Sequence, residues 1–266
     1  MSKAIYKPKG KAGEYAEWAC NLYVGCSNNC SYCYCKRGVL GHVMGAPVPT
    51  LKKCFRDPED AFNVFVKELD KNLTELQKSS LFFTFSSDPM IPETRYLNWK
   101  CILRAVGYGV KCQVLTKNAD FIYQPQLRSI LLNRNITHYD YRKNIAFGFT
   151  LTGRDDLEPG ASTNAERCET MRTLHQYGYR TFASLEPVVD PMKTVEIIYR
   201  IRDYCDLIKV GLMSGKSLSE YNRGEVERIA SWLLCSNRPY YLKKSITDYL
   251  GMPPQTPIDI FKIKRV

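Results

Sequence analysis

The sequence contains no run of about 18 apolar residues, the length that a transmembrane helix needs, so we expect no membrane-spanning segment. Its first residues, MSKAIYKPKGKAGEY, are basic but lack the apolar stretch of a secretory signal. We therefore expect a cytoplasmic protein with no membrane partner. Disulfides are rare in that reducing compartment, so the eleven cysteines need another explanation.

Acidic residues are scarce relative to basic ones. The chain of 266 residues has 27 Asp and Glu against 38 Lys and Arg, a formal net charge of +11. Such a surplus favours a polyanionic partner, and nucleic acid is the commonest. The alternative is a generally basic protein with no such partner.

Cysteine is concentrated in one place. Five of the eleven cysteines lie in residues 20–35, and the other six are single and far apart. Scattered single cysteines usually act as small buried hydrophobes. No CxxC pair occurs outside the first group, so nothing predicts a second metal centre.

Short apolar segments typical of strands alternate with helical patterns along the chain. A strand is expected at residues 18–23, then at 81–85, 110–115, 145–151, 181–185 and 207–210, with a further candidate at 240–242. Asp57 followed by Pro58 predicts one helix start, and Thr163 with Glu166 predicts a capping box at another.

This alternation predicts an α/β fold with parallel strands and right-handed crossovers. Six strands are too few for a closed eight-stranded barrel, so we expect a partial, open TIM-type (β/α)6 barrel; a doubly wound sheet is the alternative. We expect one domain over residues 1–266, with a core at about 18–215 and a C-terminal helix and tail at 216–266 that close the barrel. In both architectures ligands bind beyond the carboxyl ends of the strands.

The cysteine group follows the first expected strand. Cys26, Cys30 and Cys33 are spaced CxxxCxxC on a loop rich in Gly, Ser and Asn. An iron–sulfur cubane normally takes four cysteines, so three would leave one iron open to another ligand. The alternative is a zinc site that adds Cys35 as a fourth thiolate, although such sites usually combine two separate short pairs. We interpret Cys35 as a bystander.

CxxxCxxC after a first strand, with Tyr32 before the last cysteine, resembles the signature of the radical S-adenosylmethionine (SAM) superfamily. The resemblance implies a [4Fe–4S] cluster on Cys26, Cys30 and Cys33, with SAM bound at the open iron. It also implies that an electron from the cluster cleaves SAM to a 5′-deoxyadenosyl radical, which abstracts hydrogen from a substrate. An electron donor such as flavodoxin or ferredoxin would then be a partner.

The flanking residues resemble the spore photoproduct lyase-like branch of that superfamily. The matching stretches are residues 21–26 (NLYVGC), 32–34 (YCY), 86–89 (SSDP), 115–117 (LTK) and 163–167 (TNAER). In the lyases a hydrogen-donating cysteine immediately precedes the Ser/Thr-Asp-Pro stretch, whereas Phe85 and Ser86 stand here. The resemblance therefore points to another reaction on the same scaffold.

The ends of the expected strands supply the candidate SAM pocket. Hydroxyl and carboxylate groups at Ser86, Ser87 and Asp88 could accept from the amino group of SAM, although this stretch also has the composition of a plain turn. The ammonium of Lys117 could contact its carboxylate. The predicted cofactor-binding residues are Tyr32, Ser86, Ser87, Asp88, Lys117, Thr150, which could face the ribose, and Glu186, which is otherwise an exposed acid at the barrel mouth.

The leading hypothesis is a radical enzyme that repairs or modifies a nucleic acid or nucleotide. The alternatives are a radical activase or peptide-modifying enzyme and, in another class, a zinc-stabilised nucleic-acid-binding module. Lys243 and Lys244 follow the last strand candidate and could contact a phosphate backbone at the barrel rim. They could equally be a solvated pair on an exposed turn.

Overall fold

The protein was analysed as a computed structural model, which describes residues 4–39, 41–133, 141–236 and 238–264. Within these residues the main sheet has eight strands, and a separate two-stranded sheet pairs β3 (Tyr23–Val24) with β4 (Thr50–Leu51). The main sheet contains β1 (Ile5–Tyr6), β2 (Trp18–Cys20), β5 (Ser80–Phe83), β6 (Lys111–Thr116), β7 (Ile145–Thr150), β8 (Arg180–Val188), β9 (Leu207–Leu212) and β10 (Tyr240–Leu242).

The strands lie side by side in the order in which they occur in the chain. Strand β1 pairs antiparallel with β2, and every other neighbouring pair in the main sheet is parallel. A doubly wound sheet reverses its strand order at a switch point, which this sheet does not do within the described residues. The predicted mostly parallel α/β sheet is therefore confirmed, and its order is that of a singly wound fold.

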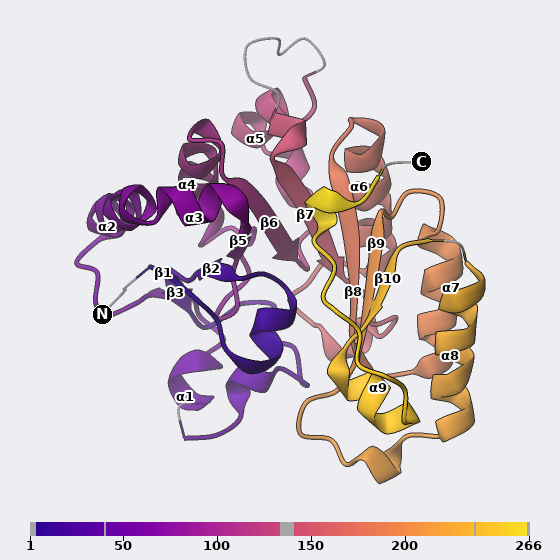
Figure 1. Cartoon of the computed structure of the whole chain (residues 1–266). Helices are drawn as coiled ribbons and strands as arrows, with labels where there is room; N and C mark the ends of the chain where they lie inside the picture. Colours follow the sequence, from indigo (N-terminus) through magenta and orange to yellow (C-terminus); the bar gives the residue numbers. More distant parts are fainter. Residues whose placement is uncertain (1–3, 40, 134–140, 237, 265–266) are drawn as a thin grey trace.

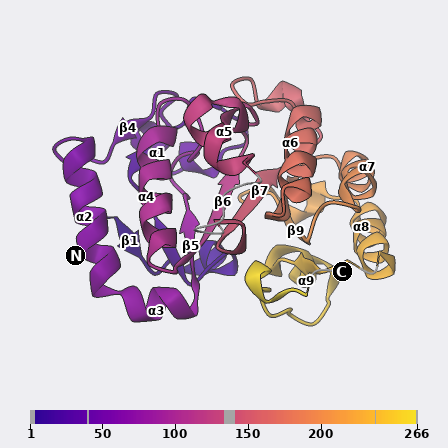
Figure 2. The same cartoon turned by 90° about the horizontal axis from the view of Figure 1, so that it is seen from above.

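The crossovers place helices along one side of the sheet, as Figures 1 and 2 show. In chain order the helices are α1 (Gly41–Met44), α2 (Pro58–Lys71), α3 (Leu73–Lys78), α4 (Arg95–Gly107), α5 (Pro125–Leu131), α6 (Asn164–Gln176), α7 (Pro191–Ile201), α8 (Arg223–Cys235) and α9 (Lys244–Leu250). After α9 the chain crosses the opposite side of the sheet (Figure 1).

Both helix starts predicted from capping residues are confirmed. The Asp57 carboxylate accepts from Asp60 N at 2.8 Å, and Pro58 is the first residue of α2. Thr163 and Glu166 form the reciprocal capping box of α6. Each cap satisfies backbone N–H groups that have no partner inside the helix, which fixes where the helix begins.

Successive strand residues point to opposite sides of the sheet, and each side has its own apolar cluster. Leu81, Phe83 and Phe147 belong to the large core that also contains the apolar helix residues. Phe82 and Phe182 point the other way and pack with residues of the C-terminal turn at Ile260–Lys262. The two clusters hold the crossover helices on one side and the tail on the other.

The predicted end of the first expected strand, residues 18–23, is wrong. Strand β2 stops at Cys20, and Tyr23 lies in β3, which pairs with β4 and not with the main sheet. The apolar run 18–23 does not show this break, because the change of partner depends on residues 50–51. The seventh strand candidate, residues 240–242, is confirmed as β10.

Candidate active site

A cavity of about 520 Å³ lies at the carboxyl ends of the parallel strands. This volume is typical of sites for small molecules and cofactors. Most of the residues predicted from the sequence line it: Cys26, Cys30, Tyr32, Cys33, Ser86, Ser87, Asp88, Lys117, Thr150, Glu186 and Lys243. The fold therefore brings together residues that are up to 217 positions apart in the sequence.

The cysteine loop is held against the segment that follows α1. Cys26 N donates to Ala46 O at 2.9 Å. Gly25 has a φ of +80°, and an added Cβ would lie 2.7 Å from Val48 O, so only glycine fits where the loop begins. This close approach fixes the start of the loop, whose three cysteines line the cavity.

All eleven cysteines lie within the described residues, and none forms a disulfide. The thiols of the cysteine loop differ in pKa. A hydrogen bond from the Cys35 thiol lowers the pKa of Cys33 to about 6, whereas burial raises the pKa of Cys26 to about 12. Cys35 itself also lines the cavity, with Sγ 3.7 Å from Phe85 O.

The three thiols of Cys26, Cys30 and Cys33 line one cavity, and single-ion and cluster sites would require different arrangements of them. In the described ranges, no three His, Cys, Asp or Glu side chains are arranged to hold one metal ion. Zinc would need four donors around one point. A cubane instead takes each thiolate at a different iron, so its ligands can stand apart around a larger volume.

Asp88 has a different role from the one predicted. Its buried carboxylate accepts four hydrogen bonds from the protein: from Asn28 Nδ2 (2.8 Å), Met90 N (2.9 Å), Thr116 Oγ1 (2.6 Å) and Lys117 N (2.7 Å). These donors occupy about all the acceptor sites of a carboxylate. Asp88 therefore ties the cysteine loop to the ends of β5 and β6, and it is not a free acceptor for the amino group of SAM.

The two serines of the same stretch also differ. Ser86 Oγ donates to Tyr23 O at 2.5 Å, so this hydroxyl is used inside the protein. Ser87 Oγ and Asn28 Oδ1 are buried at the cavity and have no hydrogen-bond partner among the residues that the structure describes. Buried polar atoms are rarely left unpaired, so both are candidates for contact with a bound molecule.

Lys117 provides a cation in the cavity. Its Nζ lies 5.7 Å from the ring centre of Tyr32 and, within the described residues, makes no hydrogen bond or ion pair. Burial alone would lower the pKa of the ammonium, but the electrostatic interaction with Cys30 and Glu158 raises it above its ordinary value. Lys117 therefore stays charged and available to an anionic group.

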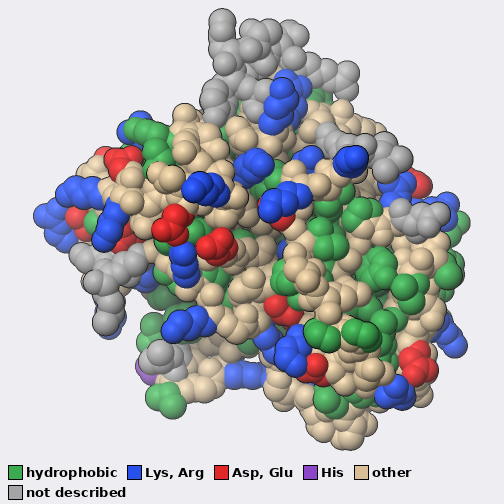
Figure 3. All heavy atoms as spheres, viewed as in Figure 1, with side chains coloured by type: hydrophobic (Ala, Val, Ile, Leu, Met, Phe, Trp, Pro, Cys, Tyr) green, Lys and Arg blue, Asp and Glu red, His purple; other side chains and the backbone are tan. Residues whose placement is uncertain are grey.

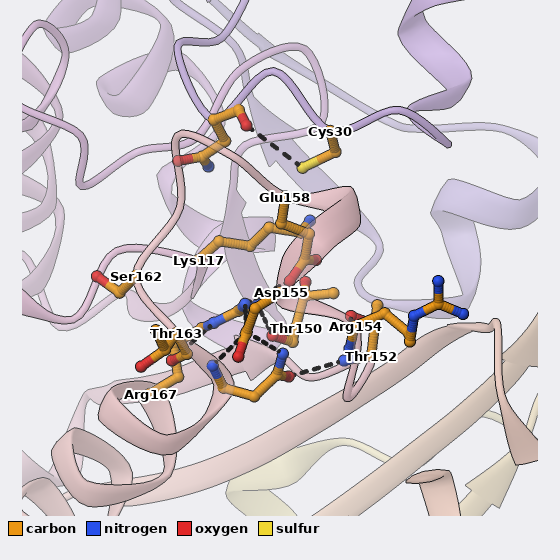
Figure 4. A network of polar contacts seen from close by, with 12 residues as sticks. Cys30, Lys117, Thr150, Thr152, Arg154, Asp155, Glu158, Ser162, Thr163 and Arg167 are labelled. Carbon is orange, nitrogen blue, oxygen red and sulfur yellow. Dashed lines mark hydrogen bonds and ion pairs between the residues drawn. The ribbon is translucent and has the colours of Figure 1, made fainter. Parts of the chain in front are cut away.

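Thr150 belongs to a buried polar network with Arg167 and Glu158 (Figure 4), and Tyr32 is connected to it through Glu158. Tyr32 Oη donates to Glu158, whose carboxylate also pairs with Arg167. The Arg167 guanidinium donates to Thr150 O at 2.5 Å, at the end of β7. The two predicted cofactor residues are thus positioned by Glu158 and Arg167, which the sequence analysis missed.

Lys243 is not a rim residue. Its side chain is only 1% exposed, and Nζ donates to Glu186 Oε2 at 2.5 Å and lies 3.4 Å from Glu14 Oε2. Tyr15 Oη donates to the same Glu186 oxygen at 2.9 Å. The predicted position of Lys243 at an exposed rim is therefore wrong, because its ammonium is buried in ion pairs with Glu186 and Glu14.

Lys244 lies outside the cavity lining that the structure describes. Its side chain is exposed and pairs with Asp248 at 2.6 Å, one turn further along α9. Other Lys and Arg side chains are scattered over the face in Figure 3, with no single dominant block. Lys11 and Lys36 are exposed at the edge of the cavity itself.

Replacing Lys243 by Met should lower the free energy of unfolding by about 3 kcal/mol, because it leaves the largely buried Glu186 and Glu14 carboxylates without their cation. Urea denaturation measures the change. The matched control, Lys244→Met, breaks only an exposed pair and should change the free energy by less than about 1 kcal/mol. Equal effects of the two substitutions would contradict the buried arrangement.

The sequence contains little local evidence for the site residues that were not predicted from it. Tyr15 precedes the first strand expected from the sequence, residues 18–23, in a segment without periodicity, and Glu158 lies in a polar loop. Arg167 falls inside the recognised stretch 163–167, but a sequence cannot show that its side chain turns inward. Long-range pairing made these residues part of the site.

No family model matches the chain. A curated relative, an uncharacterized protein of Methanocaldococcus jannaschii, is 24% identical over 194 residues. The match covers 69% of this chain and 64% of the relative. The chain therefore spans less than two thirds of the length of that relative.

Two solved structures share the fold. A spore photoproduct lyase variant with bound AdoMet (SAM) and dinucleoside spore photoproduct has a TM-score of 0.55 at 16% identity, covering 96% of this chain and 65% of that one. SuiB of Streptococcus suis has a TM-score of 0.56 at 12% identity, covering 86% of this chain and 50% of that one. The predicted resemblance to radical SAM enzymes is confirmed at the level of the fold.

Proposed function

We propose that the chain is a radical SAM enzyme that binds a [4Fe–4S] cluster at Cys26, Cys30 and Cys33. The observation that carries this proposal is the shared cavity, in which the three thiols face the cation of Lys117 at the carboxyl edge of the sheet. The fold is that of a lyase with bound AdoMet, which supports the same cofactor here. A partial, open barrel over one domain, closed by the C-terminal tail, is part of the proposal.

The polar groups around the cavity suit the zwitterionic methionine end of SAM. Lys117 offers a charge-assisted hydrogen bond to the carboxylate, and the unpaired Ser87 Oγ and Asn28 Oδ1 can accept from the ammonium. Tyr32 and Thr150 lie at the same cavity and can contact the adenosine part. Glu186 already accepts from Tyr15 and Lys243, so its second oxygen is the one left for a ribose hydroxyl.

The protein groups would orient SAM and exclude water. A cluster held by Cys26, Cys30 and Cys33 would supply one electron for the cleavage of SAM into methionine and a 5′-deoxyadenosyl radical. Lys117 and Ser87 fix the methionine end beside the three thiols, while Phe85 and Tyr15 wall the cavity with aromatic rings 5.9 Å apart. A small donor protein such as flavodoxin or ferredoxin would deliver the electron.

The test of this proposal is anaerobic reconstitution with iron and sulfide, followed by dithionite and SAM. We expect 5′-deoxyadenosine and methionine to form, as chromatography would show. A colourless, zinc-containing protein that leaves SAM intact would contradict the proposal and favour the zinc-stabilised module.

We propose a nucleic acid or nucleotide as the substrate, supported by the net charge of +11 and by the dinucleoside photoproduct in the related lyase. A base inside a duplex is shielded, so the enzyme would need a single strand or an extruded base. The exposed Lys11 and Lys36 lie at the cavity edge, where a strand would enter.

Binding to single-stranded DNA should therefore exceed binding to duplex and weaken steeply with salt, with a slope of about −0.7 per phosphate contacted. Replacing Lys11 and Lys36 together by Ala should reduce this slope by about 1 to 2, as fluorescence anisotropy over a salt titration would measure. The control is Lys244→Ala, which lies away from the cavity. Absence of salt-dependent binding by the wild type would favour a peptide substrate.

A further inference from the structure

A short segment, residues 157–160, lies against the cysteine loop; we call it the brace. Two backbone hydrogen bonds join them, from Ser31 N to Leu157 O (2.9 Å) and from Gly160 N to Asn28 O (3.1 Å). At Gly160 an added Cβ would lie only 2.0 Å from Ser27 O. The two backbones are therefore closer at this point than any side chain would allow.

Side chains reinforce the contact. The Glu158 side chain is fully buried, and one oxygen of its carboxylate accepts from Arg167 (Figure 4). The other oxygen accepts from the Tyr32 hydroxyl. Tyr32 lies between Cys30 and Cys33 in the sequence. The brace thus holds the cysteine loop by its backbone and by the side chain in its middle.

Arg167 fastens the brace to the sheet. Its side chain is fully buried in α6, where Nη1 donates to Thr150 O at 2.5 Å and Nη2 lies 3.5 Å from Asp155 Oδ1. Removing charged groups from water costs more than a typical ion pair returns unless several hydrogen bonds compensate, as they do here. The arrangement transmits the rigid position of β7 and α6 to the loop.

We propose that Glu158, Gly160 and Arg167 are positioning residues that hold the cysteine loop in the arrangement needed to keep its metal cluster. Among the described residues, none of the three lines the cavity, so they act through Tyr32 and through the loop backbone. The inference rests on the proposed function for the identity of the cluster. The support that the brace gives to the loop is independent of the proposed function, because the rigidity of the loop can be measured without any cofactor.

The first test is Gly160→Ala, which adds one methyl group against Ser27 O and changes no charge. In cluster-free protein, hydrogen exchange of the amides in residues 27–33 should become faster by about tenfold, since the loop loses its backbone partner. In reconstituted protein, release of iron to a chelator should be about tenfold to a hundredfold faster, the effect typical of groups that support metal ligands.

The matched control is Gly107→Ala, where an added Cβ meets nothing within 4 Å. Tyr32→Phe removes only the hydroxyl that Glu158 holds and should also accelerate iron release, with less effect on backbone exchange. Glu158→Gln leaves one oxygen for either Tyr32 or Arg167 and removes the charge that pairs with the buried guanidinium, so it should accelerate iron release more than Tyr32→Phe does. All comparisons are made equally far below the melting temperature of each variant, which removes differences in global stability.

Unchanged exchange in residues 27–33 and unchanged iron release in Gly160→Ala would overturn the inference. If the wild type took up no iron while Gly160→Ala still accelerated exchange, the proposed cluster would be wrong and the support of the loop by the brace would stand. If iron release changed only in proportion to the melting temperature, the brace would be a general element of stability and the positioning role would be lost.

Discussion

Replacing Cys26, Cys30 or Cys33 by Ala should abolish the cluster, reducing the iron bound after reconstitution from about four per chain to nearly none. Each of the three thiols lines the same cavity, and each would bind a different iron. Loss of one ligand leaves that iron open and the cubane unstable. Iron and sulfide analysis, with the visible absorption of the reconstituted protein, measures the outcome.

Cys35→Ala is the matched control, because Cys35 lines the same cavity and lies beside Cys33. Its iron content should equal that of the wild type. If Cys35→Ala lost the cluster while one of the other three substitutions kept it, the assignment of the ligands would be wrong. Cys54→Ala, at an exposed thiol outside the cavity lining, controls for the loss of any cysteine.

Replacing Lys117 by Met should raise the dissociation constant for SAM about tenfold to a hundredfold, because a hydrogen bond to a charged group contributes about 1.5 to 3 kcal/mol. Met keeps most of the length and apolar stem of the side chain and removes only the charge. Calorimetric titration of SAM into reconstituted protein measures the change.

The iron content of Lys117→Met should remain that of the wild type, since Nζ makes no hydrogen bond or ion pair to the described residues and its contact with the loop is only a distant one with the Tyr32 ring. Ser87→Ala should weaken SAM binding by a smaller factor, because it removes a neutral acceptor. Wild-type affinity in both variants would show that SAM does not use this end of the cavity.

The sequence predicted the sheet well because its signals were local. Buried parallel strands are short continuous apolar runs, and those after the cysteine loop are found within a few residues of the predicted positions. The start of α2 was predicted from two adjacent residues, and the cap of α6 from residues three positions apart. The error at residues 18–23 arose because the pairing of β3 depends on a segment 27 residues further along.

The site was predicted in composition but less well in detail. Parallel strands end at the same edge, so the gathering of Cys26, Lys117 and Glu186 in one cavity followed from topology. The hydrogen-bond and ion-pair partners of each side chain did not follow from topology. Asp88 is saturated by protein donors and Lys243 is buried in ion pairs, and only three-dimensional contacts could show that.

The cysteines differ in their exposure to solvent, and this difference has a practical consequence for chemical labelling. Cys54 and Cys235 are exposed, whereas the six cysteines at 20, 30, 101, 112, 168 and 205 are buried together with Cys35. A maleimide should therefore alkylate two thiols at once, giving a constant internal standard in mass spectra. Against that standard, the slower modification of Cys26 and Cys33 reports how often the mouth of the cavity admits a reagent, before any cofactor is added.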